Sequence, residues 1–85
     1  MKFNKLECVV LKRDIPKNNL RIGDVGAVVE VYPEGGIEVE FITGAGTTQA
    51  LLTVSKKDVR KIGSDDLLSI RRLDKTISEN IASAL

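Results

Sequence analysis

Apolar residues along the first sixty positions tend to recur every second residue, which is the period of strands with one buried face. The clearest case is residues 37–41, where Ile37, Val39 and Phe41 alternate with two glutamates. We expect these three side chains to point into a core. Runs of β-branched and apolar residues predict further strands, and the expected ranges are 6–12, 25–32, 37–41, 48–54 and 58–62.

Glycine-rich turns separate the central strands, at residues 33–36 and 44–47. The side chains expected to share a face are Val25, Ala27, Val29 and Val31 on one strand, and Ala50, Leu52 and Val54 on another. Gly26 lies on the opposite face from Val25, where the missing side chain permits a bulge, a bend or a close approach of another strand. Five short strands within about 60 residues favour a partly open barrel over a two-sheet sandwich, because closure hides the strand edges.

The pattern changes near Gly63, which divides the chain into residues 1–63 and residues 64–85. Ser64 or Asp65 can cap a helix, and apolar residues then recur at helical spacing. The expected stripe, and the expected oligomer interface, comprises Leu67, Ile70, Leu73, Ile77 and Ile81. A helix of about 20 residues is roughly 30 Å long, which exceeds what a small barrel covers. We therefore expect this C-terminal amphipathic helix to pair with a second copy in a dimer, with packing on its own barrel as the alternative.

The amino-acid composition narrows the range of functions that the chain can perform. The chain has no histidine, one cysteine and a net charge of +1, so the usual zinc sites and histidine-dependent catalysis are excluded and no cofactor is implied. We expect no enzyme. Cys8 sits in an apolar run and is expected to be buried. No segment has the pattern of a signal peptide or a membrane span, so we expect no membrane contact and a cytoplasmic location.

Three groups of polar residues remain. The segment Gly23-Asp24-Val25-Gly26 lacks the lysine and helix of a phosphate loop, so we expect a turn in which Asp24 accepts backbone hydrogen bonds. Four glutamates on the central strands are either solvated or an acidic docking surface. Basic residues converge if the last strand neighbours the first, and this candidate patch for an anionic partner comprises Lys12, Arg13, Lys56, Lys57, Arg60 and Lys61. A solvated mixed surface is the alternative, because aspartates are interleaved.

The run Gly23-Asp24-Val25-Gly26-Ala27-Val28-Val29-Glu30-Val31-Tyr32, with the later strands, resembles a family of short bacterial domains of unknown function over residues 3–62. It also looks like the KOW motif of ribosomal and transcription-elongation proteins, and like the small ferredoxin-docking subunit of photosynthetic NDH complexes. The resemblance implies a mainly β chain, a small five-stranded SH3-like barrel, here followed by one C-terminal α-helix. It says nothing about residues 64–85.

Together these observations predict a non-catalytic protein-interaction module that self-associates through its C-terminal helix and docks a protein partner. The alternative is a KOW-like RNA-binding accessory domain that uses the basic patch.

Overall fold

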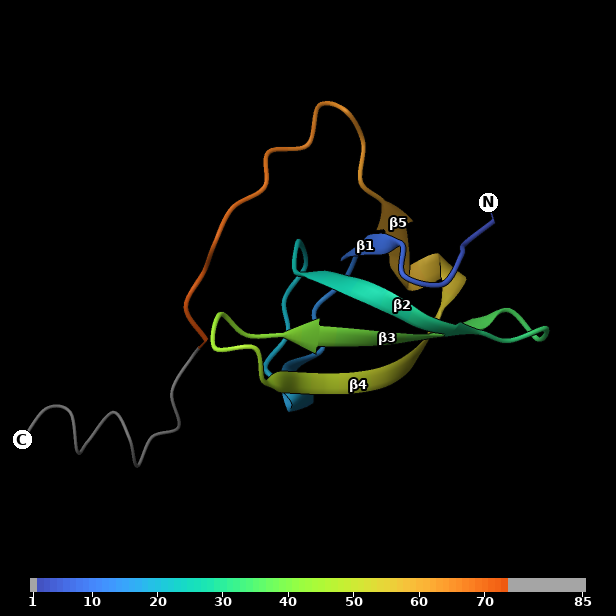
Figure 1. The fold of residues 1–85 in the computed structure, drawn as a ribbon, viewed down its shortest axis with the longest axis horizontal. Helices are drawn as coiled ribbons and strands as arrows, with labels where there is room; N and C mark the ends of the chain where they lie inside the picture. The colour runs from blue at the N-terminus through green and yellow to red at the C-terminus, as the bar shows by residue number, and fades with distance from the viewer. Residues whose placement is uncertain (1, 74–85) are drawn as a thin grey trace, which may run out of the picture.

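The computed structural model describes residues 2–73 and shows five antiparallel strands in one open sheet (Figure 1). The strands are β1 (Cys8–Leu11), β2 (Val25–Val31), β3 (Gly36–Ile42), β4 (Thr48–Ser55) and β5 (Val59–Lys61). Two single 3₁₀ turns, η1 (Pro16–Asn18) and η2 (Lys56–Asp58), lie between strands. The order across the sheet is β4-β3-β2-β1-β5, so the chain is mainly β, with strands where the alternation predicted them.

The predicted SH3-like barrel is wrong, because the sheet does not close. β4 and β5 form its two edges, and within residues 2–73 they do not pair with each other. β5 has three residues and pairs with β1, Leu11 lying opposite Val59, which leaves it too short to close against the eight-residue β4. The β4 edge carries no charged residue, proline or glycine.

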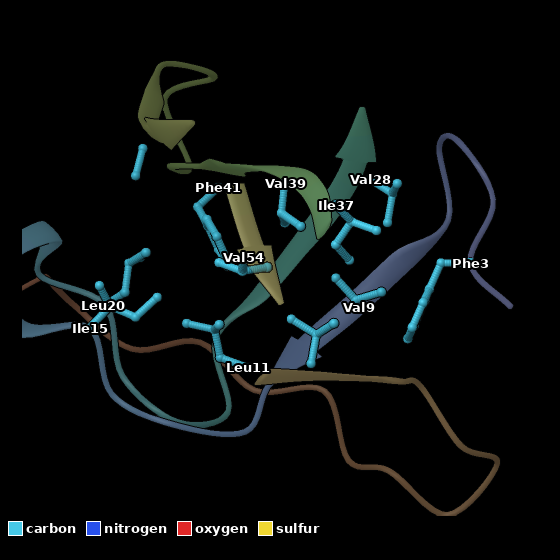
Figure 2. Close-up of a cluster of buried hydrophobic side chains, with 12 residues drawn as sticks. Phe3, Val9, Leu11, Ile15, Leu20, Val28, Ile37, Val39, Phe41 and Val54 are labelled. Atoms are coloured by element: carbon cyan, nitrogen blue, oxygen red, sulfur yellow. The ribbon is translucent and has the colours of Figure 1, made fainter. Parts of the chain in front are cut away.

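The hydrophobic core lies on one face of the sheet (Figure 2). Ile37, Val39 and Phe41 are buried as the alternation predicted, with 0%, 0% and 3% of their surface exposed. Each large aliphatic side chain that is fully buried contributes about 1.5–3 kcal/mol to folding. The cluster comprises Phe3, Val9, Leu11, Ile15, Leu20, Val28, Ile37, Val39, Phe41, Ala50, Val54 and Val59.

The alternation in β2 is interrupted by a register shift between Val28 and Glu30. Val28 is fully buried, whereas Val25 is 42% exposed. Beyond the shift Val31 packs against the core. The four residues expected on one face are therefore split, because the extra residue in a bulge turns the following side chains over.

Of the three alternatives that the sequence leaves open at Gly26, the structure shows a close approach to β3. A Cβ atom there would come within 2.5 Å of a methyl group of Val39 and 2.9 Å of the Phe41 ring. The absence of a side chain at Gly26 therefore leaves the space that these two core residues fill.

Residues 62–73 form a tail that leaves β5, runs away from the sheet and returns beside the β3–β4 turn (Figure 1). The predicted C-terminal helix is wrong for this segment, because residues 66–73 have no regular secondary structure. Asp66 is held in a turn by the backbone N–H of Gly63 at 2.5 Å, and Arg71 reaches back to the sheet. These contacts at both ends outweigh the modest helix preference of a short segment. Residues 74–85 lie outside the described part of the chain.

Candidate functional site

Asp24 closes the turn that leads into β2. Its carboxylate accepts the backbone N–H of Arg21 at 2.8 Å, and its own N–H donates to the carbonyl of Arg21 at 3.0 Å. Gly23 adopts a φ of +95°, which favours glycine, and its N–H donates to the carbonyl of Leu11 at 2.9 Å. The expectation of a structural turn with local hydrogen bonds to Asp24 is confirmed.

Arg71, in the tail, binds the same carboxylate. Its Nε donates to Oδ1 of Asp24 at 2.8 Å and its Nη2 donates to Oδ2 at 2.6 Å. Nη2 also donates to the backbone carbonyl of Asn19 at 2.9 Å. The two side chains are only 26% and 16% exposed. Nη1 of Arg71 donates to the backbone carbonyl of Arg72 at 3.3 Å. Four acceptor oxygens thus surround one planar guanidinium, which is the geometry that arginine fits and lysine does not.

The electrostatics of Asp24 follow from this arrangement. Partial burial raises the pKa of its carboxyl, but the hydrogen bonds from Arg71 and from the backbone of Arg21, with the charges of both arginines, outweigh burial and leave the pKa below its usual value. Asp24 therefore stays ionised, and it presents a partly buried negative charge to the tail.

A groove of about 610 Å³ lies between the end of the sheet and the tail. Leu20 and Phe41, each 3% exposed, contribute apolar surface that is continuous with the core. Gln49 donates from Nε2 to the carbonyl of Asn18 at 3.2 Å beside it. The lining residues are Leu20, 23–25, 41–45, Gln49 and 69–73. The tail is one wall of this groove, and the Arg71–Asp24 contact fastens that wall to the sheet.

The pairing of β1 with β5 brings the residues of the predicted basic patch near one another. Three of its six basic side chains form ion pairs with carboxylates. Arg13 pairs with Asp58 at 3.1 Å, and Lys61 pairs with Glu7 at 3.2 Å.

Arg60 makes two hydrogen bonds to Asp66, of 2.7 and 2.8 Å. Within residues 2–73, Lys12, Lys56 and Lys57 make no ion pair. The structure thus leaves three isolated lysines of the six predicted patch residues.

The predicted oligomer stripe is not a helical face in the described residues. Leu67 and Ile70 are 91% and 101% exposed, and Leu73 is half-buried against the groove. Ile77 and Ile81 lie outside the described residues. Cys8 is exposed, contrary to its predicted burial, because it occupies the outward position at the start of β1.

Two kinds of site are missing from the described part of the chain. No group of three histidine, cysteine, aspartate or glutamate side chains among residues 2–73 is arranged to hold a metal ion. The same residues contain no helix with the length and hydropathy that a membrane span requires.

The fold and the groove define a small β domain with a candidate docking site. A family model described as "Domain of unknown function (DUF4926)" matches residues 5–61, and the chain belongs to this family. The resemblance to a family of unknown function is confirmed. No curated protein matches the chain, and no solved structure matches it. The matched range includes Asp24 and all five strands, and Arg71 lies beyond it.

Sequence reasoning missed the Asp24–Arg71 contact. The sequence pattern gives Arg71 no role, and it indicates only a local turn at Asp24. The two residues are 47 positions apart, and no spacing rule connects residues at such a separation.

Proposed function

We propose that the chain is a non-catalytic protein-interaction module that docks an extended, arginine-bearing segment in the groove beside Asp24. One observation carries this proposal: the chain's own tail already lies against this surface as a segment without regular secondary structure, with Arg71 held by Asp24 and the Asn19 carbonyl. The groove adds apolar surface from Leu20 and Phe41. Ligand sites in general combine a concave apolar surface with a few polar groups that fix orientation.

The absence of catalysis belongs to the proposal and is supported by the sequence, which contains no histidine and one cysteine. The proposal also places the module in the cytoplasm, where an exposed free thiol such as that of Cys8 stays reduced.

A fluorescent peptide with the sequence of residues 66–73 tests the proposal. The full chain carrying Arg71→Ala no longer fills the Asp24 site with its own guanidinium, so we expect it to bind this peptide. Adding Asp24→Asn is expected to weaken binding about tenfold or more, because a hydrogen bond to a charged group is worth about 1.5–3 kcal/mol. The control peptide carries alanine at the position of Arg71. Equal affinity for both peptides, or no binding at millimolar concentration, contradicts the proposal.

The alternative is an RNA-binding accessory domain of KOW type. Lys12, Lys56 and Lys57 support it, since they make no ion pair within the described residues. The carboxylates paired with Arg13, Arg60 and Lys61 weigh against it, because they reduce the positive potential that attracts phosphates. The docking module is therefore the better-supported function.

A further inference from the structure

The tail is fixed at two points with an exposed bridge between them. The first anchor is Asp66, held by Arg60 and by the backbone of Gly63. The second is Arg71, held by Asp24. Between the anchors run residues 67–70, which are all exposed.

The bridge has an unsuitable composition for a solvated linker. Leu67, Leu68 and Ile70 are 91%, 67% and 101% exposed, so three of its four residues present large apolar side chains to water. Exposed apolar side chains that gather in one segment mark an interaction surface. A solvated linker of this length is ordinarily polar.

We propose that two copies of this chain exchange their tails, so that Arg71 of each copy binds Asp24 of the other. This inference rests on the proposed function, since it names the occupant of the same groove. The contacts of Arg71 with Asp24 and Asn19 are identical whether the tail comes from the same chain or from a second copy, so exchange forfeits none of them. Exchange of an identical element is a low-cost route to a symmetric dimer.

The exchange also accounts for the apolar bridge. Four residues separate the two anchors, and an extended chain spans about 3.3–3.6 Å per residue. Two sheets that exchange tails must therefore lie close together, with their two bridges side by side between them. Leu67, Leu68 and Ile70 of one copy then face those of the other, which gives the second copy an apolar contact that a single chain does not have.

Light scattering of the full chain across protein concentrations tests the exchange. We expect the wild-type mass to approach twice the chain mass of 9.3 kDa as the concentration rises, and Arg71→Glu alone and Asp24→Arg alone to remain monomeric. Mixing these two single variants restores one native Arg71–Asp24 site and one charge-reversed site, but only between chains, so the mixture is expected to dimerise. Lys57→Glu is the matched control with the same change in charge, since Lys57 is exposed and does not line the groove, and it is expected to leave the dimer intact.

A second measurement uses only the wild-type chain, so its result does not depend on whether the variants fold. In an equal mixture of isotope-labelled and unlabelled wild-type chains, exchange predicts intermolecular nuclear Overhauser effects between Leu73 and Phe41, which line the same groove. A wild-type chain that is monomeric at 1 mM overturns the exchange, and peptide binding by Arg71→Ala then decides separately whether the groove functions. A dimer that survives Arg71→Glu also overturns it and indicates another surface, such as the β4 edge.

Discussion

The side chains of Arg71 and Asp24 form two parallel hydrogen bonds of 2.8 and 2.6 Å, although the residues lie 47 positions apart in the chain. Asp24 performs two tasks at once: it accepts the backbone N–H of Arg21 within its own turn and it holds the guanidinium of the tail. The turn therefore helps to orient the carboxylate that the tail contacts.

Arg71→Lys is expected to release the tail, because an ammonium group cannot make two parallel hydrogen bonds to Asp24 while also reaching the Asn19 carbonyl. The loss of one charged hydrogen bond, about 1.5 kcal/mol or more, lowers the equilibrium constant for docking about tenfold. Amide chemical shifts of Asn19 and Asp24 measure the docked fraction. Arg72→Lys is the matched control and is expected to leave these shifts unchanged. Unchanged shifts in Arg71→Lys would show that charge alone holds the tail.

Gly26→Ala is expected to destabilise the sheet by about 1–3 kcal/mol, the usual cost of overpacking a core. The added Cβ would lie 2.5 Å from a methyl group of Val39 and 2.9 Å from the ring of Phe41. Gly44→Ala is the matched control, because nothing lies within 4 Å of its Cβ position and its φ is not positive. Urea unfolding of both variants measures the difference, and equal midpoints would contradict the close approach of β2 and β3.

Low pH is expected to weaken the hydrogen bonds that Asp66, in the tail, accepts from Arg60 and from the backbone of Gly63. The hydrogen bonds from Arg60 and from the backbone of Gly63 lower the pKa of Asp66 from 3.8 to about 2. A carboxyl whose pKa is lower in the folded protein contributes stability above its unfolded pKa and loses it as the pH falls. The contribution is therefore present above about pH 4 and disappears as the pH approaches 2.

The carboxyl ¹³C shift of Asp66 measures this pKa directly, and we expect a midpoint near 2. In thermal unfolding, Asp66→Asn should reduce the difference in melting temperature between pH 5 and pH 2. Asp65→Asn is the control, since Asp65 makes no ion pair among residues 2–73. A midpoint near 3.8 for Asp66 would show that the turn does not persist in solution.

RNA binding is expected to be absent at physiological salt, because carboxylates pair with half of the basic patch. If the RNA-binding alternative holds instead, affinity for a single-stranded RNA falls steeply with salt and Lys57→Glu with Arg60→Glu abolishes it. Electrophoretic mobility shifts at two salt concentrations distinguish these outcomes. Lys2→Glu with Lys17→Glu, at two exposed residues outside the basic patch, makes the same change in net charge and is the control.

The sequence predicts most of the sheet. Strict alternation around Ile37, Val39 and Phe41 reports one buried face directly, and the glycines at the two hairpin turns supply the positive φ that these turns adopt. In β2 the alternation misleads, because the bulge at Val28 and Glu30 depends on how β2 meets β3. Local pattern carries no information about such a pairing irregularity.

The candidate site was beyond sequence reasoning for a different reason. The residues from Ser64 onward have the caps and spacing of a helix, and helix propensity is a weak preference that tertiary contacts override. Here Arg60 holds Asp66 and Asp24 holds Arg71, so each end of the segment is bound to a residue outside it. The spacing of apolar residues reports the local helix preference of a segment, and it does not report the tertiary contacts that override this preference.

The uncharged edge of the sheet has a consequence of its own. The eight residues of β4 contain no lysine, proline or glycine to discourage a neighbouring strand, and Leu51 at its centre is 52% exposed. An extended chain that reaches this edge can add a strand to the sheet, because the backbone amides and carbonyls of an edge strand can form further ladder hydrogen bonds. Because the sheet is open at β4, this edge favours strand pairing between copies of the chain as the protein concentration rises.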